Sequence, residues 1–294
     1  MDKFFPKFKV NGKLEPSVSV VQSNTSDQIP LILSFPHSGN SYPDDFKPNP
    51  ELPYEVLDFS NDKFVDELYG TNNNHDITSI IANFPRVYID VNRHQHDIDA
   101  KMISNGDEWY GRLQPTGHKT GTTLFWSKTK EDYNLYNRLL SHKELKIRLA
   151  KCFIPYHQMM TTEIENLKKI HGKVYLLDCH SMTQFDSKIR GGNQRPEIDI
   201  GDRSGQACNK EFTNFVASEF KSLGYEVTIN KRFKGGEIIL RYGWPEINQH
   251  ILQVEIRRDL YMDENNRKKL DRFITVQKDC KTILSKIKSY VIQN

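Results

Sequence analysis

The segment Lys173-Val174-Tyr175-Leu176-Leu177 is followed directly by Asp178-Cys179-His180-Ser181-Met182. Its first half is a short apolar run, which is typical of a strand buried on both faces of a parallel sheet. Its second half is polar, and ligands of open α/β sheets gather at the carboxyl ends of the strands. A buried strand that leads straight into polar groups predicts an α/β fold with a site at the strand ends.

Short apolar runs of this kind alternate with helical patterns along the chain, which is typical of an α/β sheet covered by helices on both faces. We expect strands at Ile29–Phe35, Ile77–Ala82, Val87–Val91, Lys173–Leu177, Tyr225–Ile229, Gly236–Arg241 and His250–Ile256. We expect helices at Asn61–Tyr69, along much of Glu131–Ile170, at Gln206–Leu223 and from Glu264 to the C-terminus. Pro155 should kink or divide the longest helix near Phe153 or Ile154, and His171-Gly172 should end it.

The composition is that of a globular protein. The chain has 294 residues, of which 37% are hydrophobic and 27% charged, with a formal net charge of +3. These proportions disfavour a disordered, collagen-like or coiled-coil chain. No block of five or six like charges occurs, so nucleic acid and membrane surfaces are poor candidates for partners. No linker-like stretch divides the chain, and we expect a single domain over residues 1–294.

Cysteine usage and the N-terminal residues favour a reducing compartment. The four cysteines form no C-x-x-C pair, which argues against a disulfide scaffold or a cysteine-based zinc finger. Residues 1–6 lack the apolar run of a secretory signal, and no stretch approaches the roughly 18 apolar residues that a membrane span needs. We therefore expect a cytoplasmic protein. The least regular stretch, residues 97–130, suits either a long ordered loop near a site or a surface excursion.

Three metal-competent side chains stand near expected strand ends or helix starts. His37 follows the first strand in Phe35-Pro36-His37-Ser38-Gly39, His180 follows a later one, and Asp62 lies at an expected helix start. Two imidazoles and one carboxylate leave an open position for water, which is the pattern of a catalytic zinc site. Each residue also has a simpler explanation. A strand-end histidine is often hydrogen-bonded locally, and the helix dipole stabilises a carboxylate in a first turn.

Two further segments suit catalysis and carboxylate binding. Glu255 is central in a strand that alternates cleanly, which fits either an edge strand facing water or a general base facing a cleft. Asn92-Arg93 follows the expected strand at Val87–Val91, and an amide beside a guanidinium would clamp a carboxylate. A structural salt bridge is the alternative for Arg93. The segment Arg232-Phe233-Lys234-Gly235-Gly236 could hold an anion or simply turn the chain.

Thiol and serine chemistry are weaker alternatives. If the strand continues through Asp178-Cys179-His180, Cys179 points away from the face of its two neighbours and packs into the opposite layer. No G-x-S-x-G elbow accompanies Ser38 or Ser181, so a serine hydrolase has little support.

Eight ordered blocks together resemble the N-formylglutamate amidohydrolase family over roughly residues 30 to 265. They are P-H-S-G (36–39), N-D-K-F-V-D-E-L-Y (61–69), F-P-R-V-Y-I-D-V-N-R (84–93), P-Y-H (155–157), D-C-H-S-M (178–182), G-D-R-S-G-Q-A-C (201–208), R-F-K-G-G (232–236) and V-E-I-R-R-D-L-Y-M (254–262). The resemblance implies a three-layer α/β/α sandwich with a mixed, mostly parallel central sheet, akin to the zinc carboxypeptidases. It also implies a metal-dependent hydrolase of the amide between an acyl group and an amino acid.

The resemblance assigns roles residue by residue. It implies that zinc, or another divalent metal, binds His37, Asp62 and His180, and that Glu255 is the general base and acid. It implies that Asn92-Arg93 binds the substrate's terminal carboxylate. Arg86, Arg232, Gly235 and Gly236 are implied as further pocket residues. Asp178 could orient His180.

The implied substrate is a small N-acyl amino acid or short peptide with a free carboxylate, above all N-formyl-L-glutamate, which would give formate and glutamate. One alternative is a carboxypeptidase or a deacylase of another N-acyl amino acid with the same metal and clamp. Another is a non-catalytic module that binds an anion through Arg93, Arg232 and Lys234.

Overall fold

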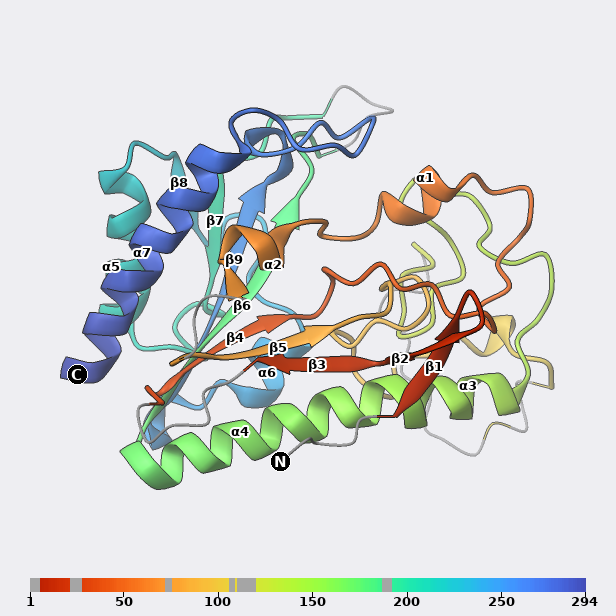
Figure 1. Ribbon diagram of the computed structural model, residues 1–294, viewed down its shortest axis with the longest axis horizontal. Helices are drawn as coiled ribbons and strands as arrows, with labels where there is room; N and C mark the ends of the chain where they lie inside the picture. Colours follow the sequence, from red (N-terminus) through yellow and green to blue (C-terminus); the bar gives the residue numbers. More distant parts are fainter. Residues whose placement is uncertain (1–5, 22–27, 72–75, 106–108, 110–119, 187–191) are drawn as a thin grey trace. The chain divides into compact units, whose positions relative to one another are not determined.

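The computed structural model describes residues 6–21, 28–71, 76–105, 109, 120–186 and 192–294. Its strands are β1 (Lys7–Val10), β2 (Lys13–Pro16), β3 (Val18–Val21), β4 (Leu31–Phe35), β5 (Thr78–Ala82), β6 (Val174–Met182), β7 (Ile198–Gly201), β8 (Val227–Ile229) and β9 (Gln249–Arg257). Its α-helices are α1 (Tyr54–Asp58), α2 (Val65–Leu68), α3 (His142–Arg148), α4 (Ile154–His171), α5 (Lys210–Ser222), α6 (Glu237–Tyr242) and α7 (Phe273–Gln293). Figure 1 shows their arrangement.

The central sheet is mixed and mostly parallel, as predicted. Its seven strands run in the order β3-β5-β4-β6-β9-β7-β8, and β1 and β2 form a separate hairpin. The pairs β4–β6, β6–β9 and β7–β8 are parallel, whereas β7 and β9 are antiparallel. Every residue of β4, β6 and β9 is buried, as expected of strands covered on both faces.

The chain forms two compact units. The first comprises Met1–Ser19, Pro36–Asn61 and Ile81–Met160, and the second comprises Val20–Phe35, Asp62–Ile80 and Thr161–Asn294. The second unit holds the strands from β6 to β9 together with α5, α6 and α7. The expected single domain over residues 1–294 stays a prediction.

Helices cover both faces of the sheet in the second unit (Figure 1). On one face, the ring of Tyr175 in β6 packs against Phe212 of α5 and Tyr290 of α7. On the other face, Gln249 of β9 accepts a hydrogen bond from Lys168 of α4 and donates one to the carbonyl of Tyr242 in α6. The predicted three-layer α/β/α arrangement is confirmed.

The longest helical region begins later than predicted and is divided where Pro155 requires it. Ser141 and Glu144 form a capping box that starts α3, so most of residues 131–141 lie outside the helix. A π-helical segment, Leu149–Phe153, separates α3 from α4 directly before Pro155. Proline has no N–H and its ring clashes with the carbonyl four residues earlier, so a wider turn accommodates it. Gly172 follows α4 with φ of 71°, as its predicted stop role requires.

The expected strand at Val87–Val91 is wrong. This buried segment forms turns, and its backbone bonds to other loop backbone and to side chains instead of a neighbouring strand. The N–H of Asp90 donates to the carbonyl of Leu124 at 2.8 Å. Arg148 Nη1 donates to the carbonyl of Tyr88 at 3.1 Å, and His157 Nε2 donates to that of Val91 at 2.9 Å.

The expected strand at Gly236–Arg241 is a helix, α6, with Gly236 as its N-cap. Ile238, Ile239 and Tyr242 are buried while Leu240 is exposed, which is helical spacing. Four strands escaped prediction: β1, β2, β3 and β7. Each of these strands has only four residues, which is too short for a hydrophobic pattern to separate strand from helix.

The remaining predicted elements exist with shifted ends: β6 is longer than expected, and α2, α5 and α7 are shorter. In the irregular stretch 97–130, residues 106–108 and 110–119 lie outside the described part of the chain. Among the described residues, no helix combines the length and apolar character needed to cross a membrane.

Candidate metal and catalytic site

β6 continues through Met182, so Asp178 and His180 lie on one face of the sheet. His180 Nε2 is 2.8 Å from Oδ2 of Asp178. The other oxygen of Asp178 accepts a hydrogen bond from Ser34 Oγ in β4, also at 2.8 Å. The carboxylate is therefore fixed between two strands, and it fixes the ring of His180. The suggested orienting role of Asp178 agrees with this geometry.

Asp62 lies three residues before α2, so the helix dipole does not explain its position. Its Oδ2 is 3.1 Å from His180 Nδ1. Its Oδ1 accepts hydrogen bonds from Ser181 Oγ at 3.1 Å and from Arg258 Nη2 at 2.9 Å. Arg258 is completely buried, so Asp62 is held by a charged partner that water does not screen. Sequence reasoning did not find Arg258.

His37, in the first unit, has its own carboxylate partner. Its Nε2 is 2.7 Å from Oδ1 of the fully buried Asp90. Asp90 Oδ2 accepts hydrogen bonds from Arg86 Nη2 at 2.8 Å and Trp126 Nε1 at 3.2 Å. Burial alone would raise the pKa of Asp90, but Arg86 and His37 outweigh it and hold this pKa well below its usual range. Asp90 is a second residue that sequence reasoning missed.

One possible ligand atom from each of His37, Asp62 and His180 lies within 4.8 Å of the others, and all three residues are buried. Nε2 of each histidine is hydrogen-bonded to an aspartate, so Nδ1 is the nitrogen that each could offer to a metal. Metal-ligating histidines commonly donate their second N–H to a carboxylate in this way. The donor set of two imidazoles and one carboxylate suits zinc and other borderline divalent metals. The cluster could therefore hold a metal.

The electrostatics around His180 favour a positive charge at this point. Burial lowers the pKa of His180, but Asp178, Asp62 and Glu255 outweigh burial and raise it well above its usual range. Carboxylates that stabilise an imidazolium would equally stabilise a divalent cation, which displaces the proton when it binds.

Glu255 lies on β9 directly opposite His180 of β6 in the parallel register. Its side chain is 6% exposed, so it does not belong to an edge strand facing water. Gln253 Nε2 donates to Glu255 Oε1 at 3.0 Å. Gln253 thus orients the expected base. The alternating pattern of this strand did not distinguish Gln253 from any other polar residue, so sequence reasoning missed its role.

The segment with the expected carboxylate clamp is ordered by Asp90, which accepts the backbone N–H of Asn92 at 3.0 Å. Arg93 is one-third exposed, and its Nε donates to the carbonyl of Thr122 at 2.8 Å. Arg86 pairs with Asp90 and lies 5.0 Å from the ring centroid of Trp126, so the structure gives it a supporting contact. The substrate-binding roles of Arg86, Asn92 and Arg93 stay predictions.

The segment Arg232–Gly236 runs beside Glu255. Asp199 of β7 lies opposite Glu255 in the antiparallel register and accepts the backbone N–H groups of Arg232 and Phe233, each at 2.8 Å. Gly236 donates its N–H to Gln253 Oε1 at 3.1 Å. Gly235 has φ of 117°, which a residue with a Cβ rarely adopts.

Cys179 faces the layer opposite the candidate site, as predicted. It is completely buried near Tyr69 and Cys280, and burial raises the pKa of its thiol well above the usual range. Burial therefore disfavours a nucleophilic thiolate at this position.

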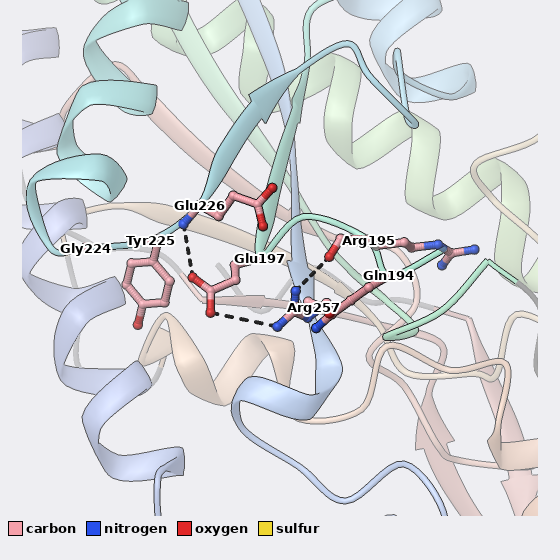
Figure 2. A pocket seen from close by; sticks show the side chains of 7 residues that line it. All are labelled: Gln194, Arg195, Glu197, Gly224, Tyr225, Glu226 and Arg257. Atoms are coloured by element: carbon pink, nitrogen blue, oxygen red, sulfur yellow. Dashed lines mark hydrogen bonds and ion pairs between the residues drawn. The ribbon is translucent and has the colours of Figure 1, made fainter. Parts of the chain in front are cut away.

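A separate polar pocket of about 590 Å³ lies at the end of β9 (Figure 2). It is lined by Gln194, Arg195, Glu197, Gly224, Tyr225, Glu226 and Arg257. Arg257 is held there by Asp259 at 2.7 Å and by the carbonyl of Arg195 at 2.7 Å. Figure 2 shows the Arg195 side chain pointing away from Tyr225 and Glu226. None of the site residues expected from the sequence lines this pocket.

Comparisons with known proteins agree on one family. A family model described as N-formylglutamate amidohydrolase matches residues 29–262. N-formylglutamate deformylase of Pseudomonas aeruginosa is 27% identical over 246 residues, which cover 81% of this chain and 84% of that protein. A crystal structure of N-formylglutamate amidohydrolase from Ralstonia eutropha JMP134 has a TM-score of 0.87 at 31% identity, over 94% of this chain and 99% of that one. The gene product Atu2144 from Agrobacterium tumefaciens shares the fold, with a TM-score of 0.62 at 18% identity over 92% of this chain and 96% of that one.

Proposed function

The chain belongs to the N-formylglutamate amidohydrolase family, and from this premise we propose that it hydrolyses N-formyl-L-glutamate to formate and glutamate in a zinc-dependent reaction. The names of its relatives support the reaction. One observation supports the metal more than any other. The buried ligand atoms of His37, Asp62 and His180 lie within 4.8 Å of one another.

The donor set fits the proposed ion. His37, Asp62 and His180 would hold zinc, with another divalent metal as a possible substitute, and the ion would act as a Lewis acid toward water and the amide carbonyl. Asp90 and Asp178 orient the two histidines through Nε2. Arg258 orients Asp62.

Glu255 is the proposed general base and acid. It accepts a proton from the attacking water and then passes a proton to the leaving nitrogen as the C–N bond breaks. The balance is one water and one amide consumed, with one carboxylic acid and one amine released. Its place beside His180 in the register supports the role, and the hydrogen bond from Gln253 keeps its carboxylate oriented.

The remaining proposed residues position the substrate. Asn92 and Arg93 bind the α-carboxylate so that the amide is oriented for attack, an effect of positioning more than of bond-making. Arg86, Arg232, Gly235 and Gly236 complete the pocket. We place the protein in the cytoplasm, with a small N-acyl amino acid or short peptide as its partner. Residues 1–294 are proposed to act as one hydrolase domain.

Formate release from N-formyl-L-glutamate tests this function. Purified protein should release formate, lose the activity on chelation and regain it when zinc is restored. N-acetyl amino acids and short peptides with a free C-terminal carboxylate are the alternative substrates. If the protein cleaves one of these but releases no formate from N-formyl-L-glutamate, it is a deacylase or a carboxypeptidase instead. Protein that binds no divalent metal and cleaves none of the substrates would contradict an enzymatic role.

A further inference from the structure

Two arginines from different segments converge on one carboxylate oxygen in the second unit. Arg195 Nε is 3.1 Å and Arg232 Nε is 3.2 Å from Oδ1 of Asp186. Arg195 Nη1 also donates to Thr183 Oγ1 at 2.8 Å, and its Cζ lies 5.3 Å from the ring centroid of Phe233. Two positive charges thus face one negative charge, in an arrangement that already holds a carboxylate.

The backbone that carries Arg232 is fixed beside the proposed base. Asp199, which is opposite Glu255 in the register, accepts the N–H groups of Arg232 and Phe233. Gly201 lets this backbone approach the sheet closely, because a Cβ there would lie 2.6 Å from the carbonyl oxygen of Phe233. The backbone of Arg232 is therefore tied to the sheet face that carries Glu255.

The far end of the same segment is tied to that face as well. Gly236 donates its N–H to Gln253, and Gln253 donates to Glu255. Arg232 keeps its side chain 49% exposed, whereas that of Arg195 is 12% exposed. Of the two cations, Arg232 is thus partly open to solvent, and the more buried Arg195 contacts the same carboxylate.

We propose that Arg195 and Arg232 form a second carboxylate subsite, which binds the side-chain carboxylate of an acidic N-acyl amino acid. This rests on the proposed function, in which Asn92 and Arg93 bind the α-carboxylate. A dicarboxylate substrate needs a second cation for its other carboxylate, since burying that charge unpaired is costly. The guanidinium forks match a carboxylate, and Asp186 shows the contact that such a group makes.

The test compares N-formyl-L-glutamate with N-formyl-L-glutamine, which has nearly the same shape but a neutral side chain. In Arg232→Gln, KM for the glutamate compound should rise about 10- to 100-fold, while kcat/KM for the glutamine compound changes by less than about 3-fold. Lys231→Gln is the matched control, because it removes the same charge from the exposed neighbouring side chain. It should leave the selectivity unchanged. An equal loss on both substrates in Arg232→Gln, or no loss on either, would overturn the subsite.

Arg195 is tested by two substitutions, since it is the more buried arginine and makes structural contacts. Arg195→Gln should lower the selectivity, and Arg195→Lys should restore part of it. Loss of selectivity in both variants to the same extent would mean that the charge is irrelevant, which contradicts the proposal. If Arg195→Gln does not fold, the substrate comparison in Arg232→Gln still tests the subsite, because the Arg232 side chain is half exposed.

Equilibrium binding separates this subsite from the proposed function. Calorimetry on the metal-loaded wild type should show tighter binding of L-glutamate than of L-glutamine, and Arg232→Gln should abolish the difference. Wild-type protein that hydrolyses neither formyl compound would refute the function but leave this binding preference measurable. Equal affinity of the wild type for the two amino acids would refute the subsite even if formate is released.

Discussion

His180 and Glu255 are register partners on the parallel strands β6 and β9, so their side chains stand on the same face of the sheet. Asp178 and Gln253, the residues that orient them, form the neighbouring pair on that face. Backbone hydrogen bonds between two buried strands therefore set the spacing of a proposed metal ligand, a proposed base and the two residues that orient them. Sites built on strands hold their geometry more tightly than sites built on loops.

Glu255→Gln should retain the metal and lose amide hydrolysis, because the amide cannot accept the proton. We expect kcat to fall at least about 10²- to 10⁴-fold. Metal content by elemental analysis and formate release are the two measurements. Gln253→Met is the companion variant, since it removes the hydrogen bonds to Glu255 and from Gly236 but leaves the carboxylate of Glu255 in place, and it should reduce kcat much less. Normal turnover in Glu255→Gln would remove Glu255 from the role of base.

Asp178→Asn should weaken metal binding about 10- to 100-fold, because the carboxylate partner of His180 loses its charge. Competition with a chelator of known affinity measures the effect. Ser34→Ala is the control, because it removes the hydrogen bond to the other oxygen of Asp178 and leaves the charge in place. Its effect should be smaller. Unchanged affinity in Asp178→Asn would show that this contact does not support a metal ligand.

Arg93→Ala should raise KM chiefly for substrates with a free α-carboxylate. The comparison is between N-formyl-L-glutamate and its α-amide, and Arg93→Lys should recover part of the lost affinity. The Arg93 side chain also donates to the carbonyl of Thr122, so circular dichroism should check that the variant is folded. A matching loss on the α-amide would count against a clamp.

Glu144 should make stability depend on pH at the start of α3. Burial raises the pKa of Glu144, but hydrogen bonds from Arg138 and Ser141 outweigh it and lower this pKa from 4.5 to about 2. The carboxylate thus stabilises the fold above about pH 4.5, and the contribution is lost as the pH falls toward 2.

Glu144→Gln should therefore cost about 1 kcal/mol of unfolding free energy at pH 7, since the group is partly exposed and screened by water. The difference from wild type should shrink at pH 3 in denaturant unfolding. Glu165→Gln, at an exposed position on α4, should change stability little at either pH. A deficit of the same size at pH 7 and at pH 2 would contradict the coupling.

The sequence predicted the layers and the strands that carry the proposed site, because the runs that become β4, β6 and β9 are buried throughout. It failed at Val87–Val91 and Gly236–Arg241, because a hydrophobic pattern of five or six residues is compatible with a strand, a helix or turns. Side chains 60 or more residues away along the chain, Arg148 and His157, satisfy the first segment, and no local pattern reports them.

The sequence could indicate the proposed ligands and base because they stand near expected strand ends, at an expected helix start or at the centre of an alternating strand. Except for Asp178, the residues that orient them could not be predicted from the sequence. Asp90 is 53 residues from His37, and Arg258 is 196 residues from Asp62. Pairings of that separation depend on the tertiary fold, so local spacing carries no record of them.

The four cysteines give the molecule an unexpected practical property. Cys152, Cys179, Cys208 and Cys280 are all buried, and burial raises the pKa of every one of their thiols. Alkylating reagents attack thiolates, so the native chain should be nearly inert toward them. A cysteine introduced at an exposed position such as Lys231 would become a unique attachment point for a fluorophore or spin label. Ligand binding at the neighbouring arginine pair could then be followed by spectroscopy with no native residue removed.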